Sequence, residues 1–345
     1  MHEAIQRAAD DLQIQLNALD QASKLATRDI NTIREVLCKK FPLPLEGRSP
    51  IDVIFLGSYG RGESTKGSDR DYLIILDGAP PPSQAKEIFR AVEGVCDELG
   101  IKKAGREGLF QEFVSSAELY TRIGLEGDTN ANTSRRLLLL TESVSAYCEK
   151  THRDLIETIV DRYCTDYDDD EEGQDSGRVP HFLLNDLTRY WRTITVDFGA
   201  KKWRALAPDW HVRYAKLRTS RKLMYAGTLA SLFLTPIASK NTTAVKEHLL
   251  KELSKPVLAR LCDCYTHFGT KGRSALKDIL LAYNRFLEIL NERGKRDLLA
   301  KGETPEAKEV IKEMRGLGDR IQEGLEVIFY DEPIFSQLTR RYGLF

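Results

Sequence analysis

One polar stretch, residues 57–71, constrains the fold of this chain more than any other feature. It reads Gly-Ser-Tyr-Gly-Arg-Gly-Glu-Ser-Thr-Lys-Gly-Ser-Asp-Arg-Asp. An apolar run, residues 53–56, precedes it, and a second apolar run, residues 72–76, follows it. Short apolar runs bounded by turn residues are typical of buried strands. The sequence therefore predicts two strands with a glycine-rich polar connection between them.

The connection ends in two aspartates, Asp69 and Asp71, at the start of the second run. Side chains two residues apart in a strand point to the same face, so these carboxylates are expected to lie close together. Two like charges so near each other are costly unless a cation lies between them. Mg²⁺ prefers oxygen ligands and is usually held by one or two carboxylates and the substrate's phosphates. We therefore predict that Asp69 and Asp71 bind a divalent metal ion.

The beginning of the connection suggests a phosphate-binding turn. Gly57 allows the backbone to turn sharply after the first strand. Ser58 is expected to begin a short helix, whose free amide groups and positive end attract phosphate oxygens. Together with Arg61 and Ser68 from the same stretch, these residues are our predicted nucleotide-binding positions.

The order of strand, Gly-Ser, short helix, Ser-Asp-x-Asp and strand resembles the nucleotidyltransferases of the DNA polymerase β superfamily. Within that superfamily, residues 57–63 and 68–71 look closest to the amino-terminal domain of the PII-protein uridylyltransferases and their uncharacterised bacterial relatives. The resemblance covers about residues 45–120, and a fainter likeness continues through residues 133–143 and 185–192. It implies catalysis with two Mg²⁺ ions, which Mn²⁺ could replace, held by Asp69 and Asp71.

Catalysis of this kind also requires a third carboxylate from a neighbouring strand, as the resemblance implies. The candidate is Glu112, in the predicted strand Leu109–Ser115, and Glu107 lies just before that strand. This departs from the usual family pattern, in which an aspartate follows an apolar residue. Without a third acid, two outcomes are open: the domain would have weak activity, or it would only bind a nucleotide.

A second local signal lies between Leu187 and Lys222, which contains ten basic and two acidic residues. The basic residues are Arg189, Arg192, Lys201, Lys202, Arg204, Arg213, Lys216, Arg218, Arg221 and Lys222. Several aromatic residues are interleaved with them. Such a segment can bind a triphosphate, an RNA backbone or an acidic protein surface; equally, the aromatics can be core and the basic residues solvated. In related enzymes a helical basic residue holds the β- and γ-phosphates; Lys216, Arg221 and Lys222 are the first candidates, and Arg189 and Arg192 the second.

The remaining pattern predicts an α+β protein with three parts. Residues 1–44 are expected to contribute one long amphipathic helix over residues 3–40 that packs on the catalytic domain. Residues 45–120 form the catalytic domain, a small mixed nucleotidyltransferase sheet with flanking helices. Residues 121–345 form an all-helical domain with an acidic loop at about residues 166–179.

The amino-acid composition limits the kinds of partner that the chain is expected to bind. The 345 residues carry 51 basic and 52 acidic side chains, so the net charge of −1 indicates no general affinity for nucleic acids or membranes. No secretory signal or membrane-length apolar run is seen, and the six scattered cysteines fit reduced thiols, so we expect a cytoplasmic protein.

The sequence thus predicts a metal-dependent nucleotidyltransferase. It would move a nucleoside monophosphate from a triphosphate such as ATP to a protein or RNA acceptor, with transfer RNA as one candidate, and release pyrophosphate. Two alternatives stay open: a nucleotide-binding regulatory or interaction protein without turnover, and a synthase of a small nucleotide signal. The base, the acceptor and the oligomeric state are not specified by the sequence.

Overall fold

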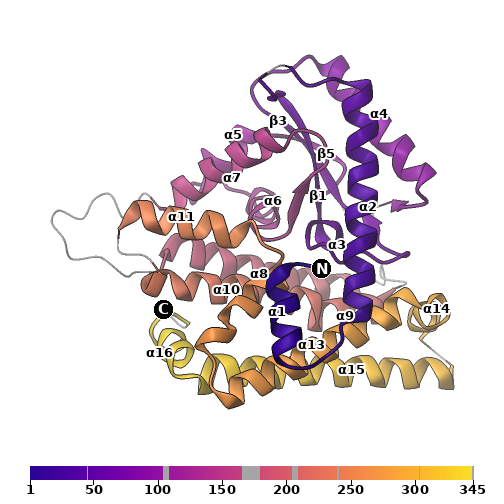
Figure 1. Cartoon of the computed structure of the whole chain (residues 1–345). Helices are drawn as coiled ribbons and strands as arrows, with labels where there is room; N and C mark the ends of the chain where they lie inside the picture. Colours follow the sequence, from indigo (N-terminus) through magenta and orange to yellow (C-terminus); the bar gives the residue numbers. More distant parts are fainter. Residues whose placement is uncertain are drawn as a thin grey trace. The chain divides into compact units, whose positions relative to one another are not determined.

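The computed structural model describes residues 1–44, 46–103, 109–164, 179–203, 209–238, 241–302 and 304–343 (Figure 1). The chain divides into two compact units. The sheet unit comprises Ala22–Gln174 and Asn241–Leu250, and the helical unit comprises Met1–Gln21, Asp175–Lys240 and Lys251–Phe345. The small mixed sheet and the many helices confirm the predicted α+β class. The predicted domain boundary near residue 120 falls inside the sheet unit, and most of the predicted acidic loop lies outside the described residues.

The sheet unit is built on a four-stranded sheet in the order β5-β3-β1-β6. Its strands are β1 (Ile51–Leu56), β3 (Tyr72–Leu76), β5 (Glu112–Ser115) and β6 (Ser143–Ser145). Strand β1 pairs in antiparallel orientation with both β3 and β6, whereas β3 and β5 are parallel. A separate parallel pair joins β2 (Asp69–Arg70) to β4 (Lys102–Lys103).

Helices cover both faces of this sheet, which explains why β1 is buried along its whole length. In Figure 1, α2 and α4 lie on one side of the sheet and α5, α6 and α7 on the other. On the first side, Phe55, Tyr72 and Ile74 pack with Ile33 of α2 and Ile88 of α4 in one apolar core. The helices of the sheet unit are α2 (Asn17–Lys40), α3 (Gly57–Gly60), α4 (Pro82–Glu98), α5 (Ser116–Tyr120), α6 (Asn130–Thr141), α7 (Glu149–Tyr163) and α11 (Thr242–Leu253), of which α2 and α11 continue into the helical unit.

The helix predicted over residues 3–40 is in fact two helices, so this expectation was wrong. Helix α1 (Glu3–Asp11) ends before a turn in which Gln13 has a positive φ of 53°, a conformation that interrupts a right-handed helix. The side-chain oxygen of Asn284 accepts hydrogen bonds from the first amides of α2. Helix α1 packs on α12 (Val257–Asp263) of the helical unit, and it is α2 that packs on the sheet.

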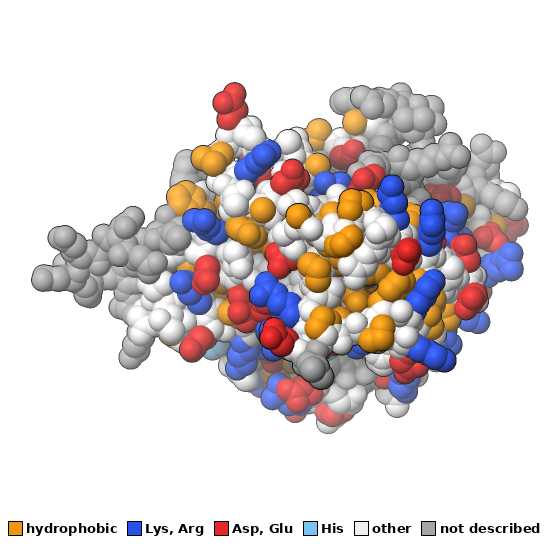
Figure 2. All heavy atoms as spheres, turned by 90° about the horizontal axis from the view of Figure 1, so that it is seen from above, with side chains coloured by type: hydrophobic (Ala, Val, Ile, Leu, Met, Phe, Trp, Pro, Cys, Tyr) orange, Lys and Arg blue, Asp and Glu red, His pale blue; other side chains and the backbone are white. Residues whose placement is uncertain are grey.

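The helical unit consists of α1, α8 (His181–Trp203), α9 (Trp210–Arg218), α10 (Ser220–Ala238), α12, a 3₁₀ turn η2 (Cys264–His267), α13 (Thr270–Asn291), α14 (Arg293–Lys301), α15 (Pro305–Glu326), a π-helical turn η3 (Val327–Asp331) and α16 (Pro333–Tyr342). Its interior contains the ring of Phe286 and the guanidinium of Arg260, which donates to the backbone oxygens of Lys255 and Leu253. Over the described ranges, none of the helices combines the length and apolar character needed to cross a bilayer. In the view of Figure 2, acidic and basic side chains are interspersed.

A buried carboxyl group, Asp52 of β1, ties the sheet to the start of α7. Its Oδ1 accepts hydrogen bonds from Ser145 Oγ at 2.9 Å and from the backbone amides of Val53 and Cys148, both at 2.7 Å. Its Oδ2 is buried and has no hydrogen-bond partner among the residues that the structure describes. Burial raises the pKa of Asp52 to about 7, because three hydrogen bonds offset only part of the cost of burying the charge.

This raised pKa predicts a distinct pH dependence of stability. An unfolded Asp titrates near pH 4, so the folded chain binds the extra proton between about pH 4 and 7, and the stability that this proton provides is lost as the pH rises through 7. Asp52→Asn keeps the acceptor oxygen and removes the charge. We expect the free energy of unfolding of the variant, relative to the native chain, to rise by about 2–3 kcal/mol between pH 5 and pH 8. Denaturant titrations at the two pH values measure this, and an equal difference at both would contradict it.

Candidate active site

The contact between Gly57 and Asp71 is the centre of the candidate site. Gly57 follows β1 directly and has a φ of +62°, which favours glycine. The backbone amide of Leu56 donates to the carbonyl oxygen of Asp71 at 2.8 Å. A Cβ atom added to Gly57 would lie 3.3 Å from Asp71 Oδ2. The Asp71 carboxylate therefore lies directly against the first residue of α3.

Helix α3 is anchored on two sides. The hydroxyl of Tyr59 donates to Asp29 Oδ2 of α2 at 3.1 Å, and burial, reinforced by Asp29, raises the pKa of this tyrosine. On the other side, a Cβ on Gly60 would lie only 1.9 Å from the carbonyl oxygen of Glu142. No side chain fits there, so α3 packs against the backbone that leads into β6.

Arg61, a predicted nucleotide-binding residue, makes ion pairs within the protein. Its Nε donates to Glu63 Oε2 at 2.8 Å, and its Nη1 donates to Glu142 Oε2. All three side chains are at most 10% exposed. Arg61 thus joins the loop after α3 to the residue before β6, and a contact between Arg61 and a nucleotide stays a prediction.

The two predicted serines shape the same loop. Ser68 is buried, and its Oγ accepts a hydrogen bond from the amide of Thr65 at 2.9 Å. Ser58 is half-buried, and its carbonyl oxygen accepts from the amide of Glu63 at 2.8 Å. The loop therefore closes through its own hydrogen bonds before the chain reaches Asp69.

The segment 69–71 departs from the single strand expected there. Asp69 and Arg70 pair with β4, and Asp71 lies between β2 and β3. The alternation of sides nevertheless persists: Arg70 is buried, whereas Asp69 and Asp71 are half-exposed. Arg70 donates to the carbonyl oxygen of Glu93 at 3.1 Å and to Asp97 Oδ1 at 2.5 Å. Its anchoring to α4 directs the two aspartates away from that helix.

Glu93 of α4 is a positioning residue that the sequence analysis missed. Its Oε1 accepts hydrogen bonds from Tyr72 Oη at 2.9 Å and from Gln111 Nε2 at 3.0 Å. It therefore connects the start of β3 to the residue before β5. The available signal was the pair of acids at i and i+4, Glu93 and Asp97, which can neutralise a buried arginine such as Arg70.

Glu112 is the first residue of β5 and pairs with Leu73 of β3. Paired residues share a face, and Leu73 follows Asp71 by two positions, so this register puts Glu112 on the face of Asp71. The Glu112 side chain is exposed. Within the described ranges, no three His, Cys, Asp or Glu side chains form a metal-binding group. The role of Glu112 as third ligand stays a prediction, and Glu107 lies outside the described residues.

The predicted triphosphate-binding residues belong to the helical unit, whereas the loop and the aspartates belong to the sheet unit. Lys216 lies in α9, and Arg221 and Lys222 lie in α10. Lys222 Nζ donates to Gln322 Oε1 at 2.6 Å, and burial, followed by the charge of Arg218, lowers the pKa of this lysine.

Of the second candidates, Arg192 is exposed, and Arg189 lies 3.9 Å from Asp186. The side chains of residues 201–204 are not among those described.

Comparison with known proteins agrees with the sheet unit's geometry. No curated protein matches this chain. Residues 30–113 match the family described as nucleotidyltransferase domain, a span that runs from α2 through β1, α3 and both aspartates into β5. The match is consistent with the DNA polymerase β superfamily and does not single out the PII-protein uridylyltransferases. This part of the chain is therefore similar to domains that transfer nucleotides.

Proposed function

We propose that the chain is a metal-dependent transferase that moves a nucleoside monophosphate from a nucleoside triphosphate, such as ATP, to a hydroxyl group of a protein or RNA. The observation that carries the proposal is the contact between the Asp71 carboxylate and Gly57, with Asp69 on the same side of the chain. A phosphate held at the start of α3 would lie beside a carboxylate that can share its cation.

The donor set fits a magnesium ion. Asp69 and Asp71 supply carboxylate oxygens and are half-exposed; phosphate oxygens and water would complete the mixture of ligands that Mg²⁺ prefers. Glu112 shares the face of Asp71 and is the candidate for a further ligand. When bound, two such ions would activate the attacking hydroxyl and neutralise the charge on the leaving pyrophosphate.

In the proposed reaction, the acceptor oxygen attacks the α-phosphorus in line with the leaving group. A bond forms between that oxygen and the α-phosphorus, and the bond to the oxygen that bridges the α- and β-phosphates breaks. Pyrophosphate leaves with the electron pair, and the hydroxyl proton passes to solvent. Gly57 and Ser58 would orient the phosphates. The role of Lys216, Arg221 or Lys222 at the β- and γ-phosphates stays a prediction from the sequence.

One observation favours the alternative, a nucleotide-binding regulator without turnover: Glu112 is exposed and forms no three-carboxylate group with Asp69 and Asp71 in the part of the chain that the structure describes. Both functions require triphosphate binding, and only the transferase releases pyrophosphate.

Removal of the two carboxylate charges tests the transferase directly. We expect Asp69→Asn and Asp71→Asn each to lower Mg²⁺-dependent transfer of label from an α-labelled triphosphate by at least about 100-fold, because each loses several kcal/mol of charge stabilisation. The assay supplies each of the four ribonucleotides with a cell lysate as the source of acceptor. Asp278→Asn, at an exposed aspartate of α13, is the matched control and should transfer normally. Triphosphate binding by the native chain without release of pyrophosphate would reject the transferase and leave the regulator.

The close approach of Gly57 to Asp71 gives a second test. Gly57→Ala introduces a Cβ against Asp71 Oδ2, whereas Gly62→Ala introduces one at a similar φ, +67°, with no atom within 4 Å. Both variants carry the same backbone strain, on the order of 1 kcal/mol. Only Gly57→Ala should lower transfer, by about tenfold or more, since a displacement of about 1 Å at a reacting group can cost 100-fold. Equal losses in the two variants, measured as kcat at matched thermal stability, would show that strain alone matters.

A further inference from the structure

The helical unit carries a row of stacked aromatic rings where α8, α9 and α10 meet. The ring of Phe198 stacks on Trp210 with centroids 4.0 Å apart, and on Tyr214 at 5.9 Å. Trp191 stacks on Tyr225 at 5.3 Å with an interplanar angle of 21°. Trp191 and Phe198 are seven residues apart, so they lie on one face of α8, about 10 Å from each other along the helix. The two clusters therefore form a single row.

These rings differ from the aromatic core of the same unit. Phe233, Tyr283 and Phe335 are at most 1% exposed. By contrast, all five rings of the row are partly exposed. Stacking itself does not separate the two groups, because Tyr283 and Phe286 of the core also stack, with an interplanar angle of 22°. The difference is exposure, which leaves aromatic surface of the row in contact with solvent.

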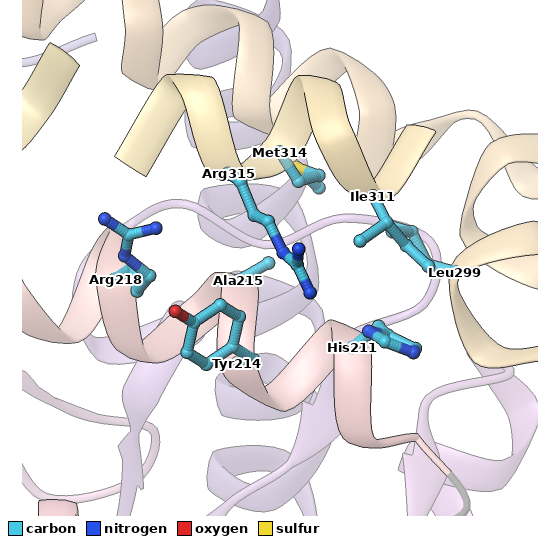
Figure 3. A pocket seen from close by; sticks show the side chains of 8 residues that line it. All are labelled: His211, Tyr214, Ala215, Arg218, Leu299, Ile311, Met314 and Arg315. Atoms are coloured by element: carbon cyan, nitrogen blue, oxygen red, sulfur yellow. The ribbon is translucent and has the colours of Figure 1, made fainter. Parts of the chain in front are cut away.

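A hollow between α9 and α15 adjoins this row (Figure 3). It is lined by His211, Tyr214, Ala215, Arg218, Leu299, Ile311, Met314 and Arg315, and none of these eight side chains is acidic. Tyr214 belongs to both features, and the Arg218 guanidinium lies 5.6 Å from the centre of its ring. In Figure 3, the Arg315 guanidinium lies between Tyr214 and His211.

The basic side chains that line the hollow are not all paired with an acidic side chain of the described residues. Arg218 forms an ion pair with Asp319 at 2.5 Å, but Arg315 is exposed and has no ion pair with any residue in the described ranges. His211 Nδ1 is buried without a hydrogen-bond partner among those residues. Burial, and then the charge of Arg315, lowers the pKa of His211. An anion such as a phosphate group would supply the exposed Arg315 guanidinium with the partner that it lacks, whereas the buried Nδ1 of His211 is out of its reach.

We propose that this row and the rim of the hollow bind a single-stranded polynucleotide, with bases stacked against the rings and a phosphate at the exposed Arg315. The proposal rests on the transferase function above and assigns the acceptor class. A row of rings suits successive bases, whereas a single triphosphate offers one base and an acidic peptide offers none. A duplex hides its base faces, so it fits the row poorly.

Binding of labelled oligonucleotides, followed by fluorescence anisotropy, tests the proposal on the full chain. We expect single strands to bind more tightly than a duplex of the same sequence and to quench tryptophan fluorescence. Arg315→Glu should weaken binding by about tenfold or more and reduce the salt dependence by about one phosphate contact. Arg320→Glu, at an exposed position of the same helix outside the hollow, is the matched control and should bind within about twofold of the native chain.

A second pair of variants tests the rings independently of charge. Tyr214→Phe keeps the ring and should bind normally, whereas Tyr214→Leu should lose about tenfold, as expected when one base loses its stacking partner. The thermal stability of both variants shows whether the helices are intact. RNA and DNA strands are compared in parallel; tight binding of either supports the proposal. Equal binding of duplex and single strands, or no effect of Arg315→Glu, would overturn it.

Failure of the polynucleotide-binding proposal can be distinguished from failure of the transferase proposal. A chain that labels a protein acceptor and does not bind single strands would refute the polynucleotide surface and retain the transferase. A chain that binds single strands through Arg315 but releases no pyrophosphate would refute the transferase and retain the polynucleotide surface.

Discussion

The register between β1 and β3 is the constraint on which the candidate site depends. The pairing of Phe55 with Tyr72 leaves Leu56 and Asp71 opposite each other, so the carboxylate meets Gly57 at the next position. A shift of one residue would turn Asp71 toward α4 and expose Arg70. The buried Arg70, with its partners Glu93 and Asp97 on α4, opposes such a shift because it would lose both its hydrogen bonds and its burial. Core packing and the aspartate positions are therefore set by the same pairing.

The charged side chains around α3 hold this short helix and its loop in place. Arg61 is enclosed by Glu63 and Glu142, and Tyr59 is held by Asp29. A four-residue helix has little stability of its own, because the free-energy cost of forming the first turn cancels most of the stabilisation from its hydrogen bonds. Contacts from α2, from the loop and from the residue before β6 replace that missing stability. A rigid turn results, which is the arrangement that a phosphate-binding site requires.

Local signals in the sequence were sufficient for the two central strands and for the need for glycine at position 57. They failed where distant residues decide the structure. The break between α1 and α2 depends on Asn284, more than 200 residues away in the chain. Strand β6, Ser-Val-Ser, is short and largely polar, and it forms because β1 offers a free edge. Arg61 pairs with Glu142, the residue before β6, and Arg70 pairs with Asp97 of α4; periodicity within one segment does not reveal such pairs.

The charge distribution bears on how an acceptor would be held. With a net charge of −1, the chain as a whole exerts no long-range attraction on a polyanion, so affinity must come from a local surface. Between Leu187 and Lys222, the described side chains include seven basic and two acidic residues. Stacking contributes to affinity without a strong preference for base, and a few cations contribute the phosphate contacts. A surface of this kind would hold a strand without reading its sequence, so the choice of acceptor would depend on its single-stranded form and on the reach of its hydroxyl group.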